Sequence, residues 1–117
     1  MTLTPAYDIC PQGRTGNVAT QAMLLKGQDR SSTLEACLNA ATDYQLGEAE
    51  AIAIVEQQIA AIAENWAEVC RLADVSPVDR ALFASRQFLN GYCLSGIEDR
   101  HVGLRDVFMQ AVSQIQA

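Results

Sequence analysis

The strongest pattern along the chain is an apolar stripe that alternates steps of three and four residues. It predicts an α-helix from about Glu48 to Ala73, because positions at this spacing share one face of a helix. Acidic residues at its start and Arg71 in its last turn suit the helix dipole. Packing within one helical domain is favoured over a coiled coil, because the run is short. The stripe, which places the tryptophan in the core, comprises Ile52, Val55, Ile59, Ile62, Trp66, Val69 and Ala73.

The segment before this helix predicts a shorter helix that ends near Tyr44. Ser32 and Glu35 have the spacing of a capping box, in which each side chain accepts a hydrogen bond from the other residue's backbone N–H. Residues 1–30 are interrupted by proline and glycine and are expected to form an irregular arm. Within this arm the pattern favours a short strand over Thr20–Leu25, followed directly by a turn.

Two more helices follow the long one. Ser76 and Pro77 form a start signal, with serine as the N-cap and proline at the first helical position, and Asn90-Gly91 is a stop signal. A last helix is expected from about Val102. The pattern therefore predicts a mainly α domain with four helices over residues 31–117, behind the arm.

Composition supports one globular domain. The chain has 117 residues, of which 50% are hydrophobic and 19% charged, which excludes a disordered tail and a collagen-like chain. No apolar run approaches the roughly 20 residues of a membrane helix. The first ten residues lack the basic and apolar regions of a secretory signal, so we expect a cytoplasmic protein that does not insert into a membrane.

Charge and cysteine spacing exclude further classes of function. The net charge is −6 and the basic residues are scattered, so direct nucleic-acid binding is not expected. The cysteines are far apart, without C-x-x-C spacing or a histidine pair, which excludes zinc and iron–sulfur sites. Reduced, buried cysteines are favoured over disulfides. These residues are Cys10, Cys37, Cys70 and Cys93.

Few side chains suggest chemistry. His101 is the only histidine, and a solvated side chain beside Arg100 is favoured over a general base, because no partner is apparent. Glu64 and Glu68 lie one helical turn apart and are candidates to share a cation. A solvated helix face, with Arg71 offsetting Glu68, is the favoured interpretation of this pair.

Asp8 differs from these residues because it lies on a segment restrained by Pro5 and Pro11. A carboxylate in such a segment is most simply a turn cap that accepts hydrogen bonds from nearby backbone N–H groups. A functional carboxylate is the alternative, because the segment holds the side chain on a rigid backbone.

The same segment carries a resemblance to a known family. Residues 3–11, LTPAYDICP, resemble the L-x-P-x-Y-D-I segment of HipA-like serine/threonine kinases, which are toxins of bacterial toxin–antitoxin pairs. The resemblance implies a helical C-terminal kinase subdomain, and it gives Asp8 the part of the metal-binding aspartate of the D-F-G motif in protein kinases. The similarity covers about residues 2 to 90 and continues through Thr20-Gln21-Ala22-Met23, Asp29-Arg30, Asn65-Trp66 and Arg86-Gln87-Phe88-Leu89-Asn90.

The chain also departs from that family. The family's catalytic loop, with its general-base aspartate and metal-binding asparagine, and its nucleotide-binding lobe precede the Y-D-I step and are not among these residues. Phosphoryl transfer needs all of these parts together. We therefore expect no catalysis by this chain alone, and Mg²⁺ and ATP as cofactors only when the missing parts are supplied. Residues 91–117 have no counterpart in the resemblance.

Two classes of function follow from these observations. In the first, the chain is part of a split or truncated HipA-like kinase and acts with a second polypeptide that carries the catalytic loop. In the second, it is an interaction module, or a remnant, that binds an antitoxin-like partner or a second copy of itself. A metal-dependent activity built on Asp8 with Glu64 and Glu68 is a third alternative, which the spacing does not support.

Overall fold

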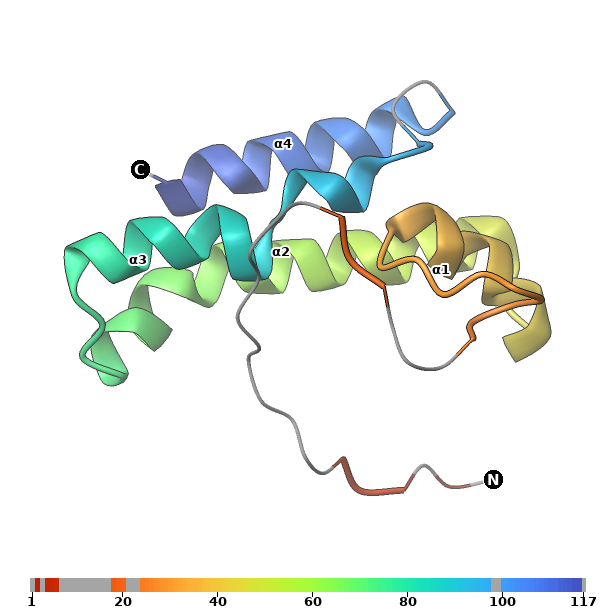
Figure 1. Ribbon diagram of the computed structural model, residues 1–117, viewed down its shortest axis with the longest axis horizontal. Coiled ribbons are helices and arrows are strands. Elements are labelled where there is room, and N and C mark those ends of the chain that lie inside the picture. Colours follow the sequence, from red (N-terminus) through yellow and green to blue (C-terminus); the bar gives the residue numbers. More distant parts are fainter. Residues whose placement is uncertain (1, 3, 7–17, 21–23, 98–99, 117) are drawn as a thin grey trace.

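Four α-helices build the described part of the protein: α1 (Leu34–Ala40), α2 (Glu48–Leu72), α3 (Pro77–Phe83) and α4 (Val102–Gln116). The computed structural model describes residues 2, 4–6, 18–20, 24–97 and 100–116. Three short helices complete it: the 3₁₀-helix η1 (Ala41–Tyr44), the π-helix η2 (Ala84–Phe88) and the 3₁₀-helix η3 (Gly91–Leu94). The predicted mainly α fold is confirmed (Figure 1).

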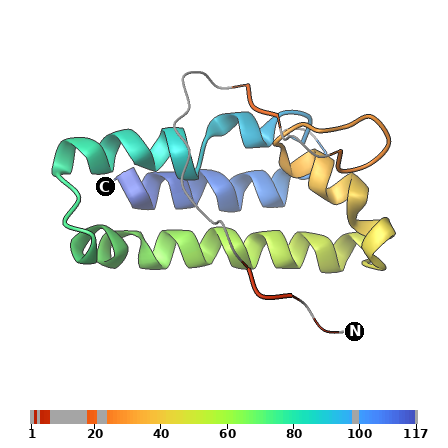
Figure 2. The same cartoon turned by 60° about the horizontal axis from the view of Figure 1, so that its bottom comes forward.

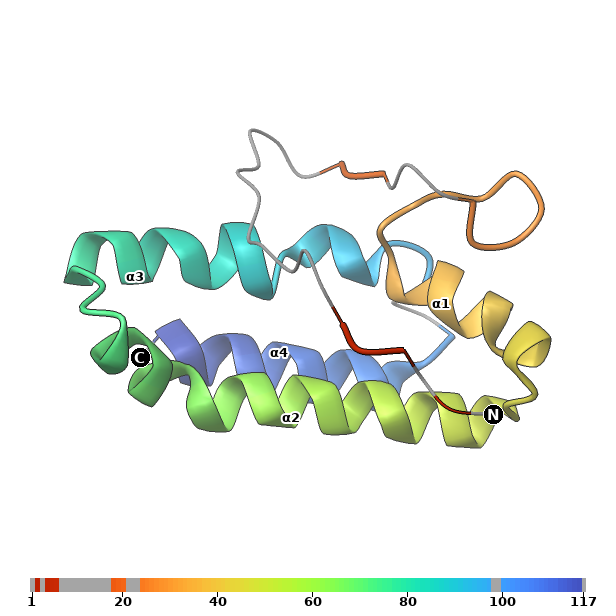
Figure 3. The same ribbon diagram turned by 90° about the horizontal axis from the view of Figure 1, so that it is seen from below.

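The helices α2 and α4 lie side by side and run in the same direction (Figures 1 and 2). The segment from α3 through η2 to η3 returns in the opposite direction, and η2 packs on α4. At the end of the bundle where α2 begins, α1 packs on α2 and on η3 (Figure 3). This order places the N-terminal ends of α2 and α4 next to each other.

The core lies between α2, α4 and the segment from η2 to Ile97. Trp66 is 6% exposed and meets Phe88 edge-on, with ring centroids 4.9 Å apart, so its predicted place in the core is confirmed. Ile97 and Leu104 are the largest side chains that are fully buried. The central cluster comprises Val55, Ile59, Ala63, Trp66, Cys70, Ala84, Leu89, Leu94, Ile97, Leu104, Phe108, Ala111 and Ile115.

The predicted bounds of the long helix are confirmed to within one residue, because α2 ends at Leu72 and Ala73 is its C-cap. The predicted stripe is only partly correct. Val69 is 55% exposed and Ala73 is exposed, so the last two positions of the stripe lie outside the core. The buried side of α2 includes Val55, Ile59 and Trp66 of the predicted stripe, together with Ala51, Ala63 and Cys70.

The start of α1 differs from the predicted capping box by one residue. Thr33, and not Ser32, is the N-cap, and its hydroxyl oxygen accepts a hydrogen bond from Ala36 N at 3.1 Å. Glu35 is therefore free of a capping role and pairs with Arg100 instead. The helix continues into η1, which ends at Tyr44 as predicted.

The start and stop signals of the third helical segment are confirmed. The Ser76 hydroxyl accepts a hydrogen bond from Asp79 N at 3.1 Å, and Pro77 is the first residue of α3. Asn90 ends the segment and caps η3, because its side chain accepts from Tyr92 N at 2.9 Å. The last helix begins at Val102 as predicted.

The described parts of the arm contain a turn and isolated bridges. Asp29 N donates to Lys26 O at 2.9 Å, and Gly27 adopts a positive φ of 57°, which confirms the predicted turn. Thr20 forms an isolated bridge with Ser31. Residues 21–23 of the predicted strand lie outside the described residues, and the described remainder of that strand forms no ladder. Among the helices described, none has the length and apolar character required to cross a membrane.

Candidate functional site

The residue that the resemblance singles out, Asp8, lies outside the described residues. The polar side chains that the structure does bring together come from α1, α2, the turn of the arm and the loop before α4. They gather at the end of the bundle where α2 and α4 begin, here called the polar end.

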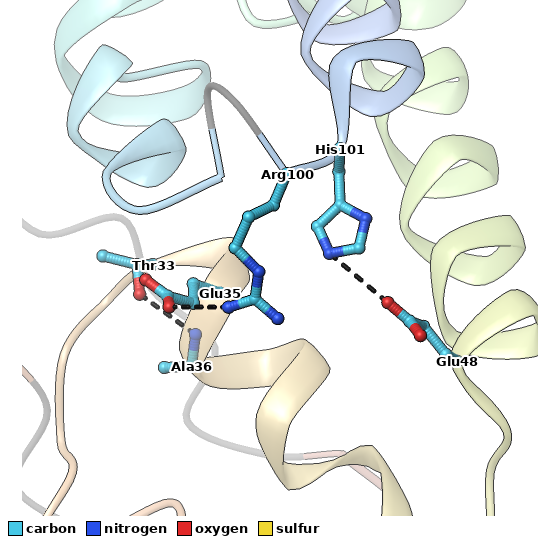
Figure 4. A network of polar contacts seen from close by, with 6 residues as sticks. All are labelled: Thr33, Glu35, Ala36, Glu48, Arg100 and His101. Atoms are coloured by element: carbon cyan, nitrogen blue, oxygen red, sulfur yellow. Dashed lines mark hydrogen bonds and ion pairs between the residues drawn. The ribbon is translucent and has the colours of Figure 1, made fainter.

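His101 immediately precedes α4 and faces the first residue of α2. Its Nε2 atom lies 3.4 Å from Glu48 Oε1, and this contact joins the two parallel helices at their N-terminal ends (Figure 4). The side chain of His101 is only 14% exposed, whereas that of Glu48 is 67% exposed. The predicted position of His101 near a helix start is confirmed, but the expectation of a solvated side chain is wrong.

An ion pair links α1 to the same loop. Arg100 Nη1 lies 3.2 Å from Glu35 Oε1, although the two residues are 65 positions apart (Figure 4). The Glu35 carboxylate packs directly over Gly96, where a Cβ atom would overlap it. Gly96 also has a φ of 90°, which L-residues with side chains rarely adopt. The positive φ therefore favours glycine at this position, whereas the Glu35 carboxylate, at the end of a flexible side chain, could move away from a Cβ atom.

Lys26 extends this polar end toward η1. Its ammonium group donates to Asn39 O at 3.0 Å and to Thr42 Oγ1 at 3.2 Å, and it lies 3.7 Å from Asp43 Oδ1. Together with His101 and Arg100 it borders a cavity of about 280 Å³. The lining residues are Lys26, Leu38, Asn39, Ala41, Thr42, Leu46, Glu48, Arg100 and His101.

At the polar end, charged side chains from different elements of the fold pair with each other. Lys26 and Arg100 each have a carboxylate within 4 Å, so their charges are offset within the fold, and the His101 imidazole lies beside the Glu48 carboxylate. His101 beside Glu48 resembles a base and its orienting carboxylate, but within the described residues no hydroxyl or thiol is hydrogen-bonded to the imidazole. Among the described residues, the polar contact of the imidazole is therefore the one with Glu48.

The two acidic residues considered as a cation site do not act together. Glu68 binds Arg71 through two hydrogen bonds, at 2.6 and 2.8 Å, as the solvated-face interpretation predicts. The hydrogen bonds from Arg71 lower the pKa of the Glu68 carboxyl. In the described part of the chain, no three His, Cys, Asp or Glu side chains are placed to hold a metal ion. The geometry therefore favours a solvated helix face.

Replacement of Arg71 by glutamine is expected to raise the pKa of Glu68 toward its ordinary value, because the hydrogen bonds that lower it are lost. In the folded wild type the lowered pKa stabilises the protein above the ordinary carboxyl pKa, and this contribution disappears as the pH falls through the lowered value. An NMR titration of the Glu68 side chain measures the change. Arg30→Gln, which removes an exposed cation in the arm, should leave the titration of Glu68 unchanged.

Three of the cysteines are described, and none of them forms a disulfide bond with another described residue. Cys70 is buried on α2, as predicted, but Cys37 is exposed, so the expectation that the cysteines are buried is wrong at this position. Although the residue as a whole is exposed, desolvation of the thiol group by the atoms around it, and then the negative charge of Asp29, raise the pKa of Cys37. A thiol with a raised pKa is a weak nucleophile at neutral pH, which argues against a reactive cysteine at this position.

A larger cavity, of about 450 Å³, lies at the opposite end of the bundle. It is bordered by the start of α3 and the end of α4, through Pro77, Arg80, Ala81, Ile115 and Gln116. Sequence reasoning missed this cavity and both long-range pairs of the polar end. No spacing rule could have found the pairs, because their members are 53 and 65 positions apart in the sequence.

No protein-family model, no curated protein and no solved structure matches the chain.

Proposed function

We propose that this chain is the helical C-terminal part of a HipA-like serine/threonine kinase of a bacterial toxin–antitoxin pair. It acts in the cytoplasm with a catalytic loop and a nucleotide-binding lobe that are not among these 117 residues. One observation carries the proposal: the nine-residue segment LTPAYDICP precedes a domain that is helical throughout its described core. An all-helical domain after the Y-D-I step is what the resemblance implies.

In this proposal Asp8 contributes a carboxylate to Mg²⁺ when ATP is bound. Mg²⁺ is typically held by one or two carboxylates together with nucleotide phosphates and water, so a single carboxylate suffices only when the other ligands are supplied. The helices would support the arm that carries Asp8. The polar end, with its offset charges, would fix α1 and the loop before α4 to the start of α2.

The second candidate function is an interaction module that binds an antitoxin-like partner or a second copy of itself. The observation in its favour is the exposure of aliphatic side chains in the last turn of α2 and in α3. Leu72 is 70% exposed and Val78 is 78% exposed, and Val69 and Leu82 are 55% and 41% exposed. Apolar side chains that are exposed together often mark a contact with another protein.

The chain alone is expected to transfer no phosphate from ATP, because the positioning groups of phosphoryl transfer come from the missing parts. Incubation of the purified chain with radiolabelled ATP and a general kinase substrate measures this. Label on the chain or on the substrate above the buffer control would contradict the proposal that further parts are required. Label that appears only after a polypeptide with the catalytic loop and the nucleotide lobe is added would support it.

A further inference from the structure

The outer face of α3 has no partner within the described residues. No residue of α3 is buried, and its two large aliphatic side chains, Val78 and Leu82, are 78% and 41% exposed. They lie four residues apart, so they share one side of the helix. Figure 3 shows α3 along one edge of the bundle. The segment is anchored from its other side, where Ala84 in η2 is completely buried.

Two opposite charges border this apolar pair. Asp79 lies in the first turn of α3 and Arg86 lies in η2, seven residues later, which is about two helical turns. Both side chains are exposed, and neither has an ion pair in the described part of the chain. The outer face of α3 therefore carries a negative charge near its start, a positive charge near its end, and leucine half-way between them.

This pattern is complementary to itself when two copies run in opposite directions. A two-fold axis beside Leu82 brings Asp79 of each copy opposite Arg86 of the other, so the same contact forms twice. Leu82 then meets its own copy at the axis, and Val78 packs over the aliphatic stem of the opposite Arg86. A parallel arrangement would place like charges opposite each other, so the charges select the antiparallel one.

We propose that the outer face of α3 is a homodimer surface, in which two copies pair α3 antiparallel through Leu82, Val78 and two Asp79–Arg86 ion pairs. A second copy is the favoured partner because its own Asp79 and Arg86 have the charges and the spacing needed to pair with Arg86 and Asp79 of the first. This surface would mediate the self-association of the second candidate function. The proposal does not depend on the kinase resemblance. The ATP assay tests that resemblance separately.

Charge reversal tests the surface. Sedimentation velocity over a concentration series is expected to show a dimer for the wild type. Arg86→Asp and Asp79→Arg should each weaken association by about tenfold or more, because each variant places like charges opposite each other in both symmetric contacts. The double variant exchanges the two charges, restores both contacts and should regain most of the affinity. Arg30→Asp, which changes the net charge as Arg86→Asp does but in the arm, is the matched control and should dimerise like the wild type.

A folding control and a variant of the apolar part of the surface complete the test. Circular dichroism establishes that each variant is folded, and Val78→Asp, at a position 78% exposed, disrupts the apolar part of the surface without touching the core. A wild type that remains monomeric up to about 1 mM, where even a weak dimer is populated, would overturn the proposal. A dimer that persists unchanged in both single charge variants and in Val78→Asp would also overturn it, because association would then use another face.

Discussion

Replacement of Leu104 by alanine is expected to lower the free energy of unfolding by about 2–5 kcal/mol. Leu104 lies in the first turn of α4 and is 2% exposed, among the side chains that α2, α4 and the loop of Ile97 bury together. Alanine removes the contacts of the branched side chain and leaves a cavity that a close-packed core closes only in part. Urea denaturation, followed by circular dichroism, measures the change as a lower midpoint at an unchanged slope.

Leu72→Ala is the matched control for this substitution. The chemical change is the same, but Leu72 is the last residue of α2 and is 70% exposed, so the free energy of unfolding should change by no more than about 0.5 kcal/mol. Equal losses in the two variants would contradict the described core. A large loss in Leu72→Ala alone would mean that this residue is buried in an interface of the folded protein.

The helices could be predicted from the sequence because their signals are local. The Ser76-Pro77 start and the apolar repeat of the long helix each depend on a few neighbouring residues, and both give the observed bounds to within one residue. The cap of α1 shows the limit of such signals. Ser32 and Thr33 are both good N-caps, and the structure uses Thr33 while Glu35 turns to Arg100.

The buried side of α2 was harder to predict because burial does not follow side-chain size. The predicted stripe follows mostly large apolar residues, including Val69, but the helix buries Ala51, Ala63 and Cys70 and leaves the last two positions of the stripe exposed. Ala63 of α2 and Ala111 of α4 lie together along the groove where these helices meet. Small side chains allow a close approach of two helices, and only the partner helix reveals which face makes it.

The candidate site was less predictable than the fold. The pairs Glu35–Arg100 and Glu48–His101 join residues from different helices and loops, so their contacts arise only after the chain has folded. Asp8 presents the opposite case. Its proposed role comes from the resemblance alone, and the residue lies outside the described part of the chain, so a biochemical test must decide between a metal ligand and a turn cap.

Asp8→Ala is expected to reduce kinase activity by about a thousandfold or more once the catalytic loop and the nucleotide lobe are supplied. The proposed Mg²⁺ neutralises charge on the transferring phosphate, and loss of a carboxylate that holds it removes this stabilisation from the transition state. Transfer of label from ATP to a protein substrate measures the effect in the completed enzyme. The helical circular dichroism signal of the chain should remain, because Asp8 precedes every predicted helix and belongs to no apolar stripe.

The comparison of Asp8→Ala with Asp8→Asn separates the two roles of this residue. Asparagine caps turns as well as aspartate does, but its neutral amide is a poor substitute for a carboxylate on Mg²⁺. A metal role therefore predicts that both variants are inactive, whereas a turn cap predicts that asparagine restores what alanine loses. Asp106→Ala, which removes an exposed carboxylate from α4, controls for the loss of negative charge and should retain activity. Full activity with alanine at position 8 would refute the metal role, and loss of the helical signal in that variant would show that Asp8 serves the fold.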